Sequence, residues 1–352
     1  MRTMRSILTA AAVAACFAPQ AHAQEKSPFA GKTITMIVGF APGGGTDIIA
    51  RWIGNGLSKY IPGNPTFVVK NIPGAEGMTS MNFVAQQVKP DGLTVVLGSS
   101  SQTDPMNYRS ANAKYDPAAF PIAGGIGRGG TFTIISAASE KRLHDRKLDP
   151  LVMGSNAGIP RNGMQMALWG IEYLGWNAKW VSGYPGTKSI FLALERNEVD
   201  MTASGNMLEF VDPLKKGKVK VLVQSGALQN GEMVPRADFA DAPLLSKLVK
   251  DKIANDPAAK DAFKYWENII AVDKFLALPP GTPSDVIQTY RTAYEKLMGD
   301  KEFLDQGKAI SEDIDLLSPP EVEHVIKSLS NTTDATLEFT KRLMRKQGLV
   351  ID

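Results

Sequence analysis

The sequence predicts an α/β protein of two lobes, each a mixed sheet flanked by helices. Three observations predict it. Strand-like and helix-like segments alternate from the N-terminus, the composition changes after Asp116, and the first pattern resumes near Tyr265. A chain of 352 residues also exceeds what one hydrophobic core ordinarily holds. We therefore expect a first lobe from residues 24–122 and 273–352, interrupted by a second lobe from residues 123–272.

The N-terminal residues 1–23 have the features of a cleavable export signal. Basic residues precede an apolar stretch, Ile7–Phe17, which is too short to span a bilayer, and Ala21–Ala23 fits a cleavage site. Lipidation at Cys16 is the alternative. Removal of the signal takes away the only cysteine, so we expect a periplasmic protein without disulfides.

The charge of the chain is close to balanced. The formal net charge is +3, and it falls to +1 once the two arginines of the signal are removed. A balanced charge argues against a nucleic-acid or anionic-membrane partner. No later apolar run approaches about 20 residues, so no further membrane crossing is expected.

The first lobe begins with a strand–helix–strand–helix–strand order. We expect strands at 34–40 and 65–71, a third strand within 91–101, and helices at 46–61 and 78–88, because apolar residues follow the corresponding periods. Such an order implies parallel strands joined by crossover helices.

Three loops follow these strands, and parallel strands bring such loops to one edge of the sheet, where ligands bind. All three loops are rich in glycine, serine or other small residues. They are Ala41–Thr46, Asn71–Gly77 and Gly98–Thr103.

The first loop, "APGGGTD", raises the question of a phosphate site. It lacks the lysine of an ATPase phosphate loop and the G-x-G-x-x-G spacing of a dinucleotide site. Thr46 is expected to cap the following helix, and Asp47 at its start would repel a phosphate dianion. The residues favour a loop whose backbone N–H groups hold a carboxylate. A tight turn without a ligand is the alternative.

The second loop, "NIPGAEG", has the same character and gives the first loop a partner on the rim. Its acid, Glu76, has two interpretations. It is a helix N-terminal acid favoured by the dipole, or it contacts a cationic group of a ligand.

The second lobe repeats the theme with strands expected at 151–155 and 177–184 and helices at 164–175 and 189–199. A domain that is interrupted and then resumed describes a two-lobed clamshell with a ligand groove between the lobes. In the second lobe Arg161 can clamp a carboxylate with paired hydrogen bonds, or it is a solvated loop residue.

Catalytic patterns are few. The two histidines beyond the signal, His144 and His324, each stand alone in a charged context, and H-E-x-x-H, paired-cysteine and G-x-S-x-G patterns are absent from the sequence. The serines 99–101 have no evident base, so we interpret them as hydrogen-bond donors. We expect a protein that is not an enzyme, with no metal and no cofactor; a secreted serine hydrolase is the less favoured alternative.

Several quoted segments together carry a family resemblance. "IVGFAPGGGTDIIARWI" resembles the opening of the substrate-binding proteins of tripartite tricarboxylate transporters, the Bordetella uptake gene (Bug) family, which typically show "PFPPGGGTD". "VVKNIPGAEGM" is similar to their "VVENRPGAGG", and "LALPPGTPSDVI" to their "PAGTP" helix start. "KPDGLTVVLGSSS" is similar to their third strand, so the resemblance spans nearly the whole mature chain.

The resemblance implies a type II periplasmic clamshell, or Venus flytrap, that binds a di- or tricarboxylate, an aromatic acid or an amino acid. It implies delivery of the ligand to membrane permease subunits, or its presentation to a signalling receptor, by a protein we expect to be a monomer. Asp47 is expected to fix its loop. In the first lobe the residues carried over as ligand-binding are Ala41, Pro42, Gly43, Gly44, Asn71, Pro73, Gly74, Ser100 and Ser101.

The second lobe departs from the family pattern. The chain has "SNAGIPRNGM" where the family often has "SSGVGSPxHL", and Ala41 and Glu76 replace a common proline and a common glycine. Closure around a ligand requires contacts that the second lobe makes only in the closed state. The candidates there are Ser155, Asn156, Gly158, Arg161, Tyr184, Gly186 and Thr202.

Overall fold

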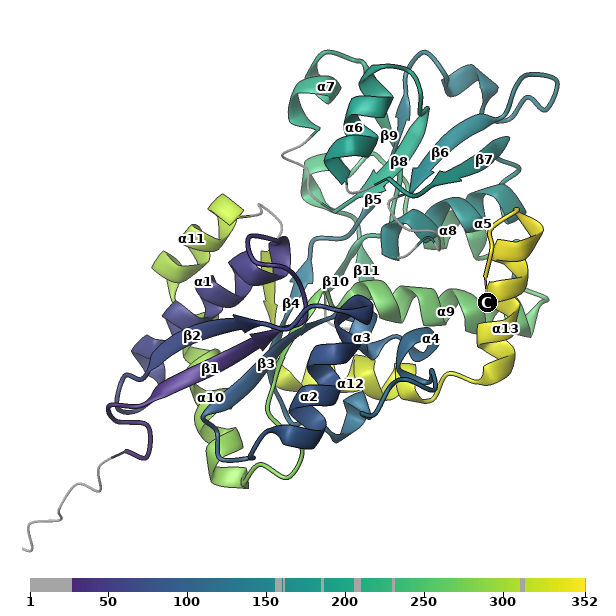
Figure 1. The fold of residues 1–352 in the computed structure, drawn as a ribbon. Coiled ribbons are helices and arrows are strands. Elements are labelled where there is room, and N and C mark those ends of the chain that lie inside the picture. The colour runs from purple at the N-terminus through teal and green to yellow at the C-terminus, as the bar shows by residue number, and fades with distance from the viewer. Residues whose placement is uncertain are drawn as a thin grey trace, which may run out of the picture.

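The computed structural model describes residues 27–155, 160, 162–184, 187–205, 210–229, 232–310 and 314–351 (Figure 1). Within them, two mixed sheets are each flanked by helices, which confirms the predicted fold class. The expected signal, residues 1–23, lies outside the described residues. The predicted lobe boundaries stay a prediction.

The first sheet has six strands in the order β13-β4-β12-β3-β1-β2. The three strands expected from the alternating pattern, β1, β2 and β3, are parallel, and the other three are antiparallel to their neighbours. Their bounds are Thr33–Val38 (β1), Thr66–Asn71 (β2), Thr94–Ser99 (β3), Ile122–Arg128 (β4), Lys274–Ala277 (β12) and Ile314–Leu317 (β13).

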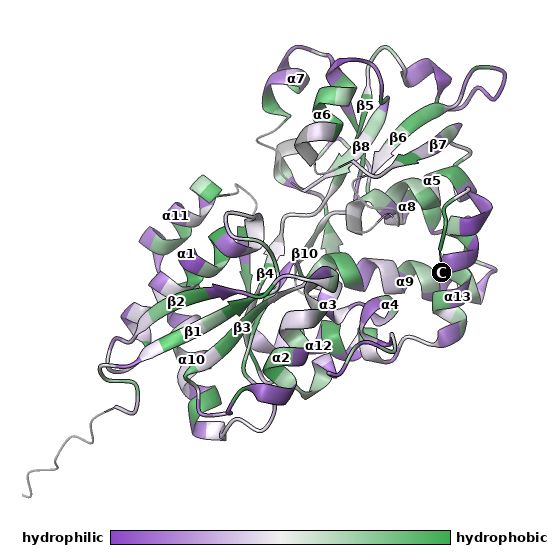
Figure 2. Ribbon diagram, in the orientation of Figure 1, coloured by the Kyte–Doolittle hydropathy of each residue, from purple (hydrophilic) through white to green (hydrophobic). Residues whose placement is uncertain are grey.

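Helices cover both faces of this sheet, which explains why its strands are nearly continuous apolar runs. Met36 and Val38 pack toward α1 and α10, whereas Ile37 packs on the opposite face with α2 and α12. Figure 2 shows the hydrophobic colour concentrated in these strands. The helices of this part are Gly45–Tyr60 (α1), Met78–Gln87 (α2), Ser100–Thr103 (α3), Pro105–Tyr108 (α4), Ser284–Met298 (α10), Lys301–Ile310 (α11) and Pro319–Ser330 (α12).

The second sheet has five strands in the order β7-β6-β8-β5-β9, with β6 parallel to β7 and β8, and β5 antiparallel to β8 and β9. Its strands are Phe132–Ser136 (β5), Leu151–Ser155 (β6), Ala178–Ser182 (β7), Met201–Ser204 (β8) and Val219–Gln224 (β9). Its helices are Met166–Tyr173 (α5), Thr187–Glu195 (α6), Val211–Lys215 (α7) and Leu245–Val249 (α8), and a hairpin follows as Ala227–Gln229 (β10) and Glu232–Val234 (β11). Short 3-10 helices lie at Ala75–Gly77, Pro117–Ala119, Glu140–Arg142, Asn162–Gln165 and Ala237–Phe239.

The chain passes between the two lobes more than once. β4 leads into β5, and helix α9 (Pro257–Ala271) returns, with Phe263 and Trp266 in the core of the second sheet and Ile269 in the core of the first. The last helix, α13 (Asp334–Lys346), adds Phe339 and Leu343 to the second core. Packing by α9 and α13 therefore ties the second lobe to the first.

The start of α1 differs from the prediction. The helix begins at Gly45 and its N-cap is Gly44, so Thr46 lies inside the first turn and is not the cap. Gly44 has extended backbone angles that suit an N-cap, so the cap lies two residues before the predicted one. Among the described residues, none of the helices has the length and apolarity needed to cross a bilayer.

Candidate functional site

The edge of the first sheet that carries the three predicted loops faces the second lobe. Ser99, at the carboxyl end of β3, pairs with Lys274 of β12, which in turn pairs with Ile126 near the end of β4. Because β4 then runs into the second lobe, this edge is the one from which the chain crosses (Figure 1). In the second sheet Phe132 at the start of β5 pairs with Ser204 at the carboxyl end of β8. The sheet edges that carry the candidate loops therefore meet the crossing in both lobes.

The first loop is a tight turn followed directly by a helix. The Gly44 N–H donates to the Ala41 carbonyl at 3.3 Å, and Gly43 has φ 76° at the third turn position. With Pro42 at the second position this is a type II turn, which requires φ above zero at the third. The three consecutive glycines thus serve as turn residue, helix cap and first helical residue.

Asp47 fixes this loop, as predicted. Its carboxylate accepts from the Gly43 N–H at 3.0 Å, from the Asn71 amide at 2.9 Å and from the Arg51 guanidinium at 3.0 Å through two nitrogens. The side chain of Asp47 is 3% exposed. The Arg51 hydrogen bond is the largest cause that lowers the pKa of Asp47, to about 2, with the Gly43 and Asn71 bonds adding to it and burial opposing it.

These bonds leave a defined set of donors at the rim. The Gly43 and Gly44 N–H groups are engaged within the loop, and the Asn71 amide nitrogen donates to Asp47 and, at 2.9 Å, to the Phe40 carbonyl. Within the described residues, the first-turn N–H groups of Gly45 and Thr46 have no protein acceptor. The first N–H groups of a helix are suited to an anionic oxygen.

The second loop has an unusual backbone. Four consecutive residues, Gly74, Ala75, Glu76 and Gly77, have φ of 141°, 44°, 57° and 90°. Ala75 and Glu76 carry side chains in the left-handed region, which costs roughly 1–2 kcal/mol per residue. The Gly74 carbonyl closes the loop by accepting from the Gly77 N–H at 2.9 Å.

Ala75→Gly is expected to raise the free energy of unfolding by about 0.5–1 kcal/mol, because glycine relieves the left-handed strain and only part of that gain is offset by added freedom in the unfolded chain. Chemical denaturation of the purified protein measures it. Ala119→Gly is the matched control: this exposed alanine is not among the positive-φ residues, so its replacement is expected to destabilise by about as much. If both variants lose the same free energy of unfolding, the backbone at Ala75 is not strained.

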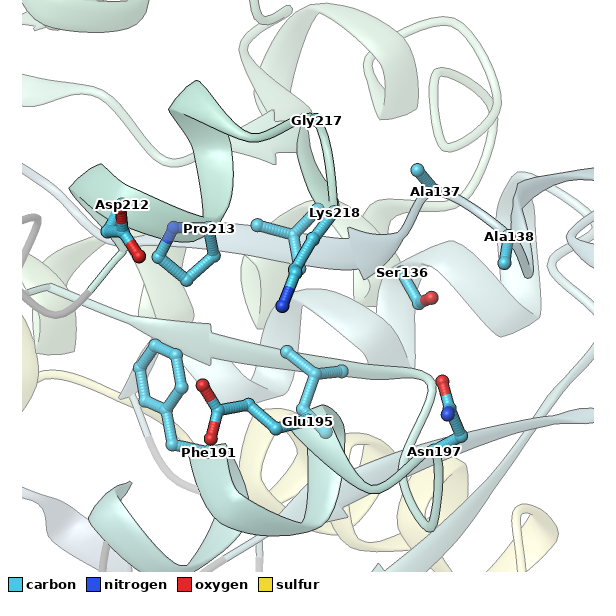
Figure 3. Close-up of a pocket in the computed structure, with 12 residues that line it drawn as sticks. Ser136, Ala137, Ala138, Phe191, Glu195, Asn197, Asp212, Pro213, Gly217 and Lys218 are labelled. Carbon is cyan, nitrogen blue, oxygen red and sulfur yellow. The ribbon is translucent and has the colours of Figure 1, made fainter.

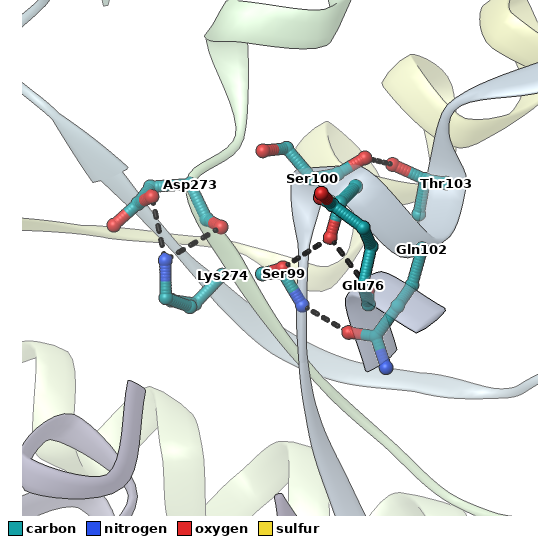
Figure 4. A network of polar contacts seen from close by, with 8 residues as sticks. Glu76, Ser99, Ser100, Gln102, Thr103, Asp273 and Lys274 are labelled. Carbon is teal, nitrogen blue, oxygen red and sulfur yellow. Dashed lines mark hydrogen bonds and ion pairs between the residues drawn. The ribbon is translucent and has the colours of Figure 1, made fainter. Parts of the chain in front are cut away.

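The third loop joins the second through side chains (Figure 4). The Ser101 hydroxyl donates to the Glu76 carbonyl at 2.9 Å, and the Gln102 amide donates to the Gly77 carbonyl at 2.9 Å. The Ser99 and Ser101 hydroxyls lie 2.9 Å apart, and Ser99 with Gln102 forms a capping box. The three loops are therefore one cross-linked unit.

Lys274 is a rim residue that sequence reasoning missed. It is 6% exposed, opens β12 opposite Ser99, and its ammonium lies 2.6 Å from the Asp273 carboxylate. The Asp273 carbonyl accepts from the Ser100 N–H at 3.1 Å, so the pair is joined to the third loop (Figure 4). The only available signal was a lysine at the head of the apolar segment "KFLAL".

The predicted second-lobe residues are partly placed. Ser155 is fully buried at the end of β6, with its hydroxyl 3.4 Å from the Met164 sulfur. Thr202 is fully buried and its hydroxyl donates to the Gly154 carbonyl at 3.2 Å, so it lies behind the rim. Tyr184 is half-buried and its N–H donates to the Ser155 carbonyl. The remaining four, Asn156, Gly158, Arg161 and Gly186, lie outside the described residues.

A pocket of about 390 Å³ lies in the second lobe, and Glu195 and Lys218 are among the side chains that line it (Figure 3). It includes Ser136, at the end of β5, and Val219, at the start of β9. These residues lie at the end of the sheet opposite the crossing, so this pocket is separate from the rim.

No family model matches the chain. A 98-residue stretch is 40% identical to a UPF0065 protein of Bordetella pertussis (strain Tohama I), and the match spans 28% of this chain and 28% of that relative. The chain therefore matches well under a third of the length of this curated relative.

Solved structures are similar over most of the chain. A TctC solute-binding protein from Polaromonas is similar with TM-score 0.62 and 18% identity, over 90% of this chain and 98% of that one. The periplasmic binding protein BugD gives 0.57 and 21%, over 90% and 98%. An R. palustris protein solved with adipate gives 0.61 and 19%, over 91% and 98%.

These likenesses agree with the resemblance found in the sequence. The chain is a homologue of a UPF0065 (Bug) protein over 98 residues, and its fold is the two-lobed fold of TctC- and BugD-type binding proteins.

Proposed function

We propose that this protein is a periplasmic solute-binding protein that captures a small carboxylate between its lobes for a tripartite tricarboxylate-type transporter. The observation that carries the proposal is the cross-linked rim of the first lobe, which presents the first-turn N–H groups of Gly45 and Thr46 toward the crossing. The similar R. palustris structure was solved with adipate, a dicarboxylate, and this supports the class of ligand.

We propose the following roles for the predicted first-lobe residues. Ala41, Pro42, Gly43 and Gly44 shape the turn, and Asn71 positions it against Asp47. Carboxylate oxygens then accept from the first turn of α1, because an anion is favoured at a helix N-terminus. Pro73 and Gly74 are exposed in the second loop. We propose that they border the bound carboxylate together with Ser100 and Ser101 of the third loop.

A second candidate function is the presentation of the bound solute to a signalling receptor, and it uses the same ligand site. The serine-hydrolase alternative has little support, because the Ser101 hydroxyl is engaged with the Glu76 carbonyl and with Ser99. A nucleophile would need a base at that hydroxyl.

Thermal denaturation of the mature protein with aliphatic dicarboxylates, tricarboxylates, aromatic acids and amino acids tests the proposal. An acid present at a hundred times its dissociation constant is expected to stabilise the protein by about 2.7 kcal/mol. If none of these acids raises the melting temperature, the proposal fails. Titration calorimetry then gives the affinity of each acid that binds.

Gly45→Pro tests whether the Gly45 N–H group binds the carboxylate. Proline is tolerated at the first helical position, and Gly44 before it is already extended, so the variant removes one N–H group and retains the helix. Loss of a hydrogen bond to a charged oxygen weakens binding by about 1.5–3 kcal/mol. Gly45→Ala keeps the N–H group and is the matched control. Equal affinities for the two variants would place the carboxylate elsewhere.

A further inference from the structure

A pocket of about 550 Å³ lies where the two lobes adjoin, and we call it the interlobe pocket. Its walls include Met233 of β11, Ser246 of α8, Glu267 of α9 and His324 of α12. Helix α12 packs in the core of the first sheet, α8 packs in the core of the second, and α9 enters both (Figure 1). Among the described residues that line the pocket, none comes from the three rim loops. The interlobe pocket is therefore separate from the rim and shared by both lobes.

The lining of the interlobe pocket offers hydrogen-bonding groups that the protein does not use. The side chains of Ser246 and Asn268 are half-buried, and neither has a hydrogen-bond partner among the described residues. The imidazole of His324 is also without such a partner in the described part of the chain. Met233 and Val325 add apolar surface. A concave, partly apolar pocket of several hundred Å³ with a few converging polar groups is typical of a small-molecule site.

Glu267 sets the charge that such a molecule would need. The side chain of Glu267 is 17% exposed, and its ion pair with Lys264 is long, at 3.5 Å, to a lysine side chain that is 65% exposed. Burial raises the pKa of Glu267 above its ordinary value, and the Lys264 ammonium opposes this only in part. A further cation beside this carboxylate would stabilise its charged form.

The other charged groups of the pocket favour the same sign of ligand. Glu232 lines it from β11 and Glu321 from α12, where Glu321 also caps its own helix through Ser318. Within the described lining, Lys264 is the one lysine or arginine that faces these acids. A cation is therefore attracted to the interlobe pocket, whereas a second carboxylate would be repelled from it.

We propose that the interlobe pocket binds a small organic cation, such as an alkyl diamine, with an ammonium group at Glu267 and its carbon chain against Met233 and Val325. Because α8 and α12 pack in the cores of different sheets, a change in the separation of the lobes changes the walls of the pocket. The affinity for the cation then depends on whether a carboxylate is bound in the cleft. This dependence rests on the proposed function, whereas the cation site itself does not.

Titration calorimetry of the mature protein with putrescine and cadaverine tests the cation site, each beside the diol of the same chain length. At least one diamine is expected to bind about tenfold or more tightly than its diol, because charge-assisted hydrogen bonds replace neutral ones. Glu267→Gln keeps the shape of the side chain and removes its charge. The affinity of this variant for the diamine is expected to fall about tenfold, toward that of the diol.

Glu323→Gln is the matched control for the loss of one negative charge. Glu323 precedes His324 in α12, but its carboxylate is paired with Arg291, and it is not among the described residues that line the pocket. Its diamine affinity is expected to equal that of the wild type. Equal losses in Glu267→Gln and Glu323→Gln would show that the diamines bind only to a general negative surface. That result overturns the proposal, and so does equal binding of diamines and diols or no binding of either.

A repeat of the titration with a saturating acid from the thermal screen tests the link between the two sites. The diamine affinity is expected to change by about fivefold or more, and the acid affinity by the same factor when the diamine is saturating, because coupling between sites is reciprocal. Unchanged affinities overturn the link. If no acid binds, the proposed function fails and the link fails with it, while the comparison of diamines with diols still decides the cation site.

Discussion

Asp47→Ala is expected to lower the free energy of unfolding by about 3 kcal/mol and to abolish carboxylate binding. The Asp47 side chain is 3% exposed and accepts hydrogen bonds from Gly43, Arg51 and Asn71. Its removal takes away the charged acceptor of the Gly43 N–H and of part of the Asn71 amide, and a hydrogen bond to a charged group contributes roughly 1.5–3 kcal/mol. The turn that orients the first helical N–H groups loses its anchor at the same time. Urea denaturation and calorimetry with an acid that binds the wild type measure both effects.

Arg51→Ala is the matched control for the ion pair alone. The Arg51 side chain is 52% exposed, and an ion pair with an exposed partner contributes little to stability. The bonds from Gly43 and Asn71 to Asp47 remain, so ligand binding is expected to persist. Arg51→Ala could instead lose as much unfolding free energy and ligand affinity as Asp47→Ala. That result would assign the effect to the salt bridge and not to the hydrogen bonds that hold the loop.

The same carboxylate makes stability depend on pH in acid. The folded-state pKa of Asp47 is lowered to about 2 from 3.8, so the unfolded chain binds a proton first as the pH falls. The stabilisation is complete above pH 4 and is lost between about pH 4 and 2. The difference in unfolding free energy between the wild type and Asp47→Asn is therefore expected to shrink by about 2 kcal/mol across that window. Other acids of the protein also titrate in this pH window. The test is therefore the difference in unfolding free energy between the two proteins, and not the pH dependence of either one alone.

The sequence predicted the elements of the site better than their local geometry. The alternation of strands and helices places the three loops at one edge, because parallel order follows from crossover helices of this length. The role of Asp47 also followed, since an acid directly after a glycine loop has backbone N–H groups within reach. Each of these relations joins residues that are close in the sequence, so the local sequence is enough to predict it.

Relations between loops were not available from the sequence. The Gln102 side chain joins the third loop to Gly77 across 25 residues of chain. The position of Lys274 opposite Ser99 depends on sheet register across about 175 residues. The left-handed backbone of Ala75 and Glu76 was equally hidden, because neither residue type signals positive φ. Thr46 shows the opposite error: a good capping residue was preferred over Gly44, which the turn places at the cap.

Gly39→Ala is expected to lower the free energy of unfolding by about 2–3 kcal/mol and to disrupt the binding rim. Gly39 follows β1 at the point where the first two loops meet. A Cβ atom there would lie 2.5 Å from the Ser80 hydroxyl and 2.7 Å from the Gly77 Cα. The Ser80 side chain can rotate only by giving up its bond to the Gly77 carbonyl, and the Gly77 backbone is itself held by Gln102. Overpacking of such a braced contact costs about 1–3 kcal/mol and shifts backbone.

The backbone that Gly39→Ala displaces belongs to the second loop. The same overpacking that lowers stability is therefore expected to weaken ligand binding. Gly127→Ala in β4 is the matched control: it is a buried strand glycine of the same sheet, and its Cβ would meet Leu317 at an ordinary 3.5 Å. Its stability is expected to change by less than about 1 kcal/mol, with ligand affinity retained. If Gly39→Ala unfolds like Gly127→Ala and binds the same acid with wild-type affinity, the contact between the loops is not what positions the rim. If instead the affinity falls much more than the stability, the close approach of the first two loops is what sets the geometry of the carboxylate site.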